Sequence, residues 1–491
     1  MAGLFLIVFG TKVLLIAAFG SPVPYWDQWD AEAANLFVPY LDGHLSLSSL
    51  IEPHNEHRIL LTRLMALVLF ELAGEWDPIL EMLLNAVIHA AFVTGLAWLL
   101  LPLIDASRRM VFLAFMALAF GLPIGWENTL AGFQSQFYFL LIFSTLMLLA
   151  LARATAFSPG WFAGVASAIA AFFSLASGAL GPLTGAALAA AQIATGVRSR
   201  NSREVFAIIL LIAIAVVMVR SVPLAATEIS AKGPADFVHA ALAIASVPLH
   251  GIPGGVILAH LPLGWFVLRA VRVPLPARSR TWLIVGLAGW LVAQVLSVAY
   301  SRAAGALSAR YLDIVLIALP LDLVALFAIL DSSTRQRLGA WLTAAASTWV
   351  FVIVTATIVV GYHEGWSGAL GRGRDGVIQQ QNVMAYLASG DMAALVNKPM
   401  LAIPYPSPQR LADLLSNSMV RAMLPDAIRP ADADINGVRQ RTLLKGRFAQ
   451  IVGRLKSGVL LSGPALLGAG LAAMFAFSVG RAGSPRNPSR P

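Results

Sequence analysis

Three carboxylates stand within six residues directly after the first apolar stretch of the chain: Asp27, Asp30 and Glu32. An aspartate held in partly apolar surroundings can act as a general base, because desolvation raises its pKa toward neutrality. The alternative is an aromatic belt at a membrane surface with solvated carboxylates, in which Tyr25 and Trp26 anchor the chain. Only 25 of the 491 residues are acidic, so this concentration favours function. We therefore predict that Asp27 or Asp30 is a catalytic base and that Glu32 contacts substrate.

A second polar cluster, at 53–58, is the densest in the chain. Imidazole and carboxylate groups are metal ligands, so a divalent metal is one alternative here, but the spacing lacks the helical His-x-x-x-His pair. We expect no metal cofactor, and we favour substrate binding and positioning of the helix that follows. The residues expected to contact substrate are His54, Asn55, Glu56, His57 and Arg58.

Two arginines between later apolar stretches, Arg302 and Arg310, could bind a phosphate group together with Tyr311. A guanidinium fork matches phosphate oxygens and stabilises a leaving group that gains negative charge. The alternative is that both side chains snorkel to the membrane surface. We predict that these three residues bind the phosphate of a donor substrate. Further candidates for substrate contacts stand together in another turn: Glu127, Asn128 and Gln134.

The composition requires membrane helices to position these residues. Hydrophobic residues make up 58% of the chain and charged residues 12%, about half of the charged content of soluble domains. The apolar stretches reach the roughly 20 residues that a helix needs to cross a bilayer, whereas a barrel would alternate weakly over about 10 residues. The chain has no cysteine, which excludes disulfides and thiolate chemistry. The net charge of +9 comes mostly from arginines beside apolar stretches. This placement indicates how the chain is oriented in the membrane and does not indicate nucleic-acid binding.

We predict an all-α polytopic membrane protein with about twelve transmembrane helices. The stretch Ile59–Ala73 is shorter than the others and carries Arg63 and Glu71, so we predict that it is an interfacial helix on the outer leaflet. The first apolar stretch lacks a charged leader, which favours an uncleaved helix over a signal peptide. The expected spans are Gly3–Gly20, Ile79–Leu103, Met110–Ile124, Phe137–Ala152, Trp161–Ser177, Pro182–Gly196, Val205–Val222, Ile252–Leu268, Trp282–Ala299, Leu312–Leu330, Ala340–Gly361 and Gly458–Val479.

The distribution of arginine orients the chain, because cytoplasmic loops carry an excess of positive residues. Most arginines between spans fall on one side, which we expect to be the cytoplasmic side of the cell inner (plasma) membrane, with both termini. The predicted organisation is a membrane domain at 1–361 with a catalytic outer loop at 21–78, an extracytoplasmic segment at 362–456, a last helix at 457–480 and a disordered tail at 481–491.

In this order the motifs resemble the GT-C class of membrane glycosyltransferases, which includes protein O-mannosyltransferases and bacterial aminoarabinose transferases. In that family an outer loop with an acidic motif follows the first helix, and an interfacial helix introduced by a histidine- or proline-containing segment follows the loop. Asp27 with Asp30, the cluster at 53–58 and Ile59–Ala73 occupy those places. Arg310-Tyr311 looks like the family's late Arg-Tyr pair. The family often has His-Pro-Pro or Lys-Pro-Pro before the interfacial helix, and the departure here indicates a divergent bacterial subgroup.

The resemblance implies an enzyme that moves a sugar from a polyprenyl-phosphate donor to an extracytoplasmic acceptor with inversion. Asp27 or Asp30 would remove the proton of the acceptor hydroxyl, and arginine would hold the lipid phosphate as it leaves. Two other functions stay open. The many spans also suit a transporter or flippase for a lipid-linked or anionic solute. The segment at 362–456 could instead bind a partner in an assembly factor without catalysis of its own.

Overall fold

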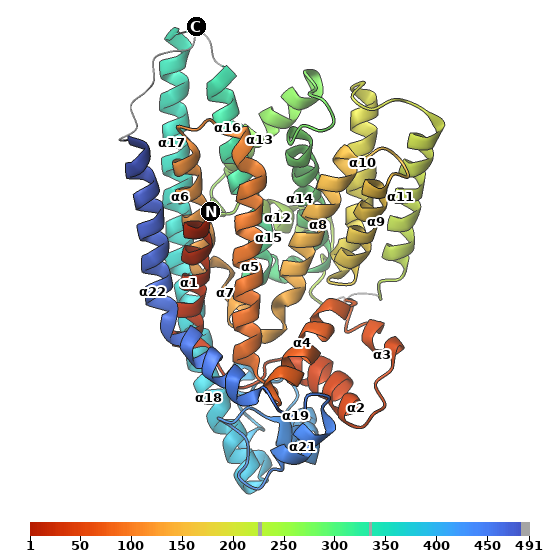
Figure 1. Cartoon of the computed structure of the whole chain (residues 1–491), viewed down its shortest axis with the longest axis vertical. Helices are drawn as coiled ribbons and strands as arrows, with labels where there is room; N and C mark the ends of the chain where they lie inside the picture. The colour runs from red at the N-terminus through yellow and green to blue at the C-terminus, as the bar shows by residue number, and fades with distance from the viewer. Residues whose placement is uncertain (224–227, 333–335, 483–491) are drawn as a thin grey trace.

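The computed structural model describes residues 1–223, 228–332 and 336–482, and the regular secondary structure in these ranges is helical. Within them no strand occurs, and the backbone pairing of His54 with His57 is the only isolated β-bridge. Long apolar helices stand side by side, and short helices gather at one end of the molecule (Figure 1). The predicted class, an all-α protein with many apolar helices, is confirmed. Residues 483–491 of the predicted tail lie outside the described ranges.

The apolar bundle contains the helices that carry the predicted spans. In the described residues, ten helical segments are long and apolar enough to cross a membrane. Helices α9 and α10 fall on two further predicted spans but have only 14 and 15 residues, so the number of crossings stays a prediction. The bundle helices are α1 (Ala2–Phe19), α5 (Pro78–Leu100), α6 (Arg109–Gly121), α8 (Ser135–Arg153), α9 (Pro159–Phe172), α10 (Leu180–Ala194), α11 (Ser202–Arg220), α12 (Pro234–Ala245), α13 (Gly255–Arg272), α14 (Thr281–Ser301), α15 (Ala309–Val315), α16 (Ala318–Ser332), α17 (Gln336–Val360) and α22 (Ala449–Ala482).

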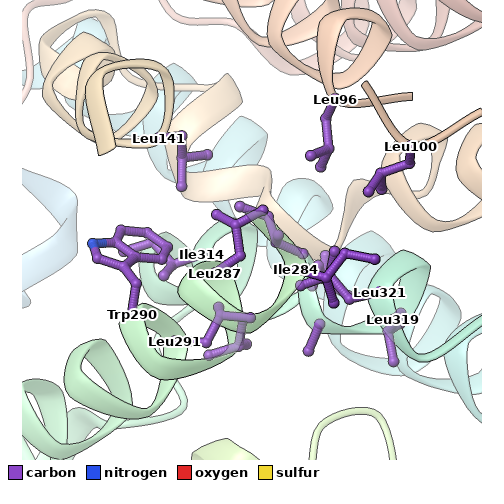
Figure 2. Packing of buried hydrophobic residues seen from close by; sticks show 14 of the residues in the cluster. Leu96, Leu100, Leu141, Ile284, Leu287, Trp290, Leu291, Ile314, Leu319 and Leu321 are labelled. Atoms are coloured by element: carbon purple, nitrogen blue, oxygen red, sulfur yellow. The ribbon is translucent and has the colours of Figure 1, made fainter. Parts of the chain in front are cut away.

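The centre of the bundle is filled by aliphatic and aromatic side chains from several helices. Helix α14 crosses the middle and meets α8, α10 and α15. Figure 2 shows part of this packing, in which Leu96 of α5, Leu141 of α8, Leu287 and Trp290 of α14 and Ile314 of α15 come together. These side chains are buried between helices, so their packing fixes how the outer ends of the helices are placed.

The first and last helices of the bundle, α1 and α22, pack along one another through glycines. A methyl group on Gly10 would come within 2.7 Å of the backbone nitrogen of Leu467, and one on Gly470 would come within 2.8 Å of that of Ile7. Membrane helices associate through such close backbone approach, since lipid gives no hydrophobic drive between them. The pairing places the loop that follows α1 beside the segment that precedes α22.

These segments, at 21–77 and 361–448, are called the outer segments after their predicted side of the membrane, and they share one hydrophobic core. It combines Trp29, Phe37 and Trp76 of the first segment with buried residues such as Leu411 and Met423 of the second. The first segment contains the π-helix η1 (Trp29–Phe37), α2 (Val38–Leu41), α3 (Leu47–Ile51) and α4 (Leu60–Ala73). The second contains α18 (Ser367–Ser389), which continues α17 through the π-helix η7 (Gly361–Trp366), and then α19 (Pro408–Ser416), α20 (Ser418–Met423) and α21 (Ile435–Arg441). In Figure 1 these elements lie together at the lower end.

Helix α4 is the element predicted to lie on the outer leaflet. Its two charged residues bond to neighbouring protein groups: Arg63 donates to the carbonyls of Ser49, Leu50 and Glu52, and Glu71 accepts the backbone N–H of Leu444 at 2.8 Å. Leu64 and Val68 are exposed on the other face. The depth of this helix in the membrane stays a prediction.

The shared core predicts that a cavity in one outer segment loosens both. Met423→Ala removes a fully buried side chain, whereas Met400 in the same segment is 61% exposed. Truncating a buried methionine costs about 2–5 kcal/mol. We expect limited proteolysis of membranes to cut the Met423→Ala variant faster in both outer segments, with Met400→Ala cut at the wild-type rate. Equal cleavage of both variants would contradict a common core.

Candidate functional site

The first outer loop is anchored by Gln28 and Trp29, which are both fully buried. The indole of Trp29 donates to the carbonyl of Pro24 at 2.8 Å. The amide of Gln28 donates to Glu32 at 2.9 Å and to Glu81 at 2.8 Å. Because these two residues point inward, the aspartates on either side of them are directed to two other surfaces.

Asp30 faces the second outer segment. One carboxylate oxygen accepts from Nε and Nη2 of Arg410 at 3.1 and 2.8 Å, and the other accepts from the phenol of Tyr405. Burial and the hydrogen bond to Asp30 raise the pKa of Tyr405 to about 12, so the phenol remains a donor. Both oxygens of Asp30 are thus engaged in a link between the outer segments.

Asp27 faces the cluster at 53–58. Its Oδ1 lies 3.3 Å from Nε2 of His54, and 42% of its side chain is exposed. Burial raises the pKa of Asp27, but the contact with His54 and the charges of His54, Arg310 and His57 together lower it below its ordinary value. For Asp27 the prediction of a pKa raised toward neutrality is therefore wrong. The physical reason is that positive neighbours outweigh desolvation.

A tight two-residue turn presents His54 and His57 to the same side. The backbone N–H of each donates to the carbonyl of the other, at 2.8 and 3.0 Å, and Asn55 adopts a left-handed φ of +51° to close the turn. Residues directly opposite in an antiparallel pair direct their side chains to one face. Burial lowers the pKa of His57 to about 4, so its ring is neutral at physiological pH. Its Nδ1 faces the N–H of Ala176 at 3.4 Å.

Each of the two predicted phosphate-binding arginines has a carboxylate partner. Arg302 forms an ion pair with Glu56, which also lies 3.5 Å from His57. Nε and Nη2 of Arg310 lie 3.4 Å from the carboxylate of Glu127. That carboxylate also accepts the backbone N–H of Arg310 at 2.8 Å. The fold therefore brings Asp27, both histidines and both arginines to one region, but it gives the arginines protein partners.

The other predicted contacts lie around this region. Glu32 is buried and accepts from the indole of Trp76 at 2.9 Å. Asn128 is buried and donates to the backbone carbonyl of Arg310 at 2.9 Å. Arg58 donates to two backbone carbonyls at 2.8 and 3.3 Å. These three side chains support the walls of the site.

Three more predicted residues are less constrained. Asn55 is exposed at the tip of the turn. The ring of Tyr311 lies 6.1 Å from that of Phe137. Gln134 follows Phe133, whose ring stands edge-on to His54 at 5.7 Å, and within the described residues its Oε1 is buried without a hydrogen-bond partner.

The sequence analysis missed the residues that the second outer segment and its helix contribute: Arg372, Tyr405 and Arg410. Arg372 lies in α18 with its guanidinium 4.0 Å from the ring centroid of Tyr25. The signal that singled out Arg302 and Arg310 was arginine on a side otherwise poor in it. That signal is lost in the segment at 362–456, because charged residues are common there.

No protein-family model, curated protein or solved structure matches this chain. Among the described residues, no group of three or more histidine, aspartate or glutamate side chains is placed to hold a metal ion. The chemistry of the site must therefore be inferred from its own geometry.

The placement of Glu32 predicts a pH-dependent stability. Burial raises the pKa of Glu32 to about 7, so folding favours the protonated acid, and this stabilisation is lost as pH rises from the ordinary glutamate pKa toward 7. The loss is on the order of 3 kcal/mol. We expect the apparent Tm in detergent to fall between pH 5 and pH 8 for the wild type and to fall less for Glu32→Gln, in which Glu81, the other carboxyl bonded to Gln28, remains. Glu52→Gln, in an exposed position of the same segment, should behave as the wild type. A wild-type pH dependence in Glu32→Gln would contradict this assignment.

Proposed function

We propose that this chain is a membrane glycosyltransferase that moves a sugar from a polyprenyl-phosphate donor to an extracytoplasmic acceptor with inversion. The observation that carries the proposal is the position of Asp27. It is a half-exposed, ionised carboxylate beside His54 and within reach of the charge of Arg310. This is the arrangement that a general base needs next to a site where an anionic group departs.

Asp27 suits the role of base better than Asp30 does. Asp30 is occupied by Arg410 and Tyr405, whereas Asp27 keeps an exposed face. In the proposed step, Asp27 takes the proton of the acceptor hydroxyl while that oxygen forms a bond to the anomeric carbon. The bond from this carbon to the phosphate oxygen breaks, and the lipid phosphate leaves with the electron pair. An acceptor that covers Asp27 would displace water and strengthen it as a base.

An apolar groove in the bundle fits the lipid part of such a donor. Its volume is about 710 Å³, and it is lined by small and aliphatic side chains of α10, α12, α13, α14 and the α15–α16 region. One lining residue, Val315, belongs to the same short helix as Arg310. A chain of isoprene units could therefore lie in the groove while its phosphate reaches the region of Asp27.

The proposed orientation puts this region on the extracytoplasmic side of the inner membrane, with both termini in the cytoplasm. The arginine-bearing turns at the other end support it: Arg108 pairs with Asp331 at 2.7 Å, and Arg280 donates to the carbonyl of Leu99. Cytoplasmic loops are the arginine-rich ones. A lipid-linked donor suits the outer face, because nucleotide sugars are cytoplasmic.

A transporter is the second candidate, and one observation favours it. His260 in α13 lies 2.7 Å from the fully buried Asp322 in α16, within the wall of the groove. Ionisable pairs inside a membrane often mark solute or proton pathways. Asp322→Asn should abolish solute flux if the chain is a transporter, whereas a glycosyltransferase should keep its transfer activity.

The proposed base is tested by single substitutions. Asp27→Asn should lower sugar transfer roughly 10²–10⁴-fold, the contribution of a general base, while the protein stays folded in the membrane. Asp30→Asn should loosen the outer segments, and Asp42→Asn, in the same segment, should leave transfer unchanged. The measurement is transfer of radiolabelled sugar from polyprenyl-phosphate donors in membranes. Full activity of Asp27→Asn would rule this base out.

The groove is tested by filling it. A Cβ atom added to Gly264, which lines the groove, meets no atom within 4 Å, and the same is true of Gly95 in α5. Gly264→Leu should therefore fold and raise the KM for long-chain polyprenyl donors more than for short-chain donors, because the new side chain occupies the path of the lipid. Gly95→Leu is the matched control. An equal effect on donors of all lengths would exclude this groove as the lipid site.

A further inference from the structure

Arg372 stands out among the cationic groups near Asp27 because it is almost fully buried and only partly bonded. Arg372 is 4% exposed. Nη1 donates to Oε1 of Gln379 at 3.0 Å. Within the described residues, Nε and Nη2 have no hydrogen-bond partner. A buried guanidinium with unused donors is costly unless a further group supplies acceptors.

The two unused nitrogens form one edge of the guanidinium fork, and this edge binds a carboxylate in two neighbouring arginines. Nε and Nη2 of Arg410 both donate to Asp30, and the same atoms of Arg310 donate to Glu127. Parallel N–H groups on this edge match two oxygens of a carboxylate or phosphate. For Arg372, no aspartate or glutamate of the described residues forms an ion pair with this edge.

The surroundings of Arg372 offer donors to an anion. Its guanidinium lies over the ring of Tyr25, with 4.0 Å to the centroid. The ring of Trp26 lies 5.9 Å from that of Tyr25, and its indole N–H also has no partner in the described part of the chain. The titratable groups that act on Tyr25 are Arg372, Glu127, Arg310 and Asp375. Arg310 acts on Asp27 as well, so Arg372 belongs to the same region as the proposed base.

In the proposed topology, Arg372 lies at the height of a lipid headgroup. The next residue, Gly373, packs against Phe19, the last residue of α1, and Gly376 packs against Ser21. The end of a membrane-spanning helix marks the boundary between hydrocarbon and headgroups. A phosphate attached to a lipid in the bilayer would be found at this level.

We propose that the Nε–Nη2 edge of Arg372 binds the phosphate group of the substrate. This inference rests on the proposed function, and it names a residue that the sequence did not indicate. Arg302 and Arg310 position the loops through Glu56 and Glu127, whereas Arg372 holds the phosphate. Tyr25 supports the flat face of the guanidinium, which leaves the Nε–Nη2 edge for the ligand.

Binding can be measured apart from transfer. The full chain in zwitterionic nanodiscs would be titrated with undecaprenyl phosphate and, separately, with inorganic phosphate. Loss of a charged two-point contact should weaken binding roughly tenfold to a hundredfold in Arg372→Gln. Arg372→Lys, which keeps the charge without the fork, should bind with intermediate affinity. Arg374→Gln, an exposed arginine in the same helix, is the matched control and should bind as the wild type.

Two variants of Tyr25 test the site without changing Arg372, so a folding defect of the Arg372 variants cannot decide the result. Tyr25→Phe keeps the ring below the guanidinium and should retain binding, whereas Tyr25→Leu should weaken it. Binding of the lipid phosphate alone would assign the source to a membrane donor, and binding of both anions would show that free phosphate suffices. If Arg372→Gln binds as tightly as the wild type, or the wild type binds neither anion, the inference is overturned.

The two proposals fail in different ways. If binding depends on Arg372 but no sugar is transferred, the phosphate site is supported and the glycosyltransferase proposal is refuted. If Arg372→Gln transfers sugar at the wild-type rate, the glycosyltransferase proposal is supported and the phosphate site at Arg372 is refuted.

Discussion

The close packing of α1 against α22 is the constraint on which the outer half of this protein depends. Glycines such as Gly10 and Gly470 let the two backbones approach where any side chain would clash. The loop after α1 and the segment before α22 therefore emerge beside one another and bury one core. Without that pairing, Asp30 would not meet Arg410 and Asp27 would not have a fixed direction.

The charges of the outer region are arranged mostly as pairs between distant elements. Glu56 with Arg302 and Glu127 with Arg310 join loops to the ends of bundle helices. Partly buried pairs of this kind contribute little net stability but are costly to break on one side, so they act mainly as positioning contacts. Against this background, Asp27 keeps a half-exposed carboxylate, and the Nε–Nη2 edge of Arg372 has no hydrogen-bond partner among the described residues.

The sequence predicted the class of fold, because apolar length is a local pattern. The expectation that Asp27, His54, His57, Arg302 and Arg310 share one site came from the arginine bias, which puts their loops on one side of the membrane, and from the family resemblance. The sequence did not predict that Glu56 and Glu127 neutralise the arginines, since each pair joins residues far apart in the chain. The predicted spans also did not include α12, because its 12 residues fall below the length that marks a span. The pKa of Asp27 depends on neighbours that only the fold supplies.

The contact between Asp30 and Arg410 joins residues that are 380 positions apart in the chain. At roughly 5–20 residues per second, a ribosome needs about 20 to 75 seconds between them. The first outer loop is therefore synthesised long before the segment that packs on it. Its tryptophans stay uncovered until nearly the whole chain has been made. Any factor that shields exposed apolar surface during insertion would act on this loop, and a chain that stops before α22 would never assemble its site.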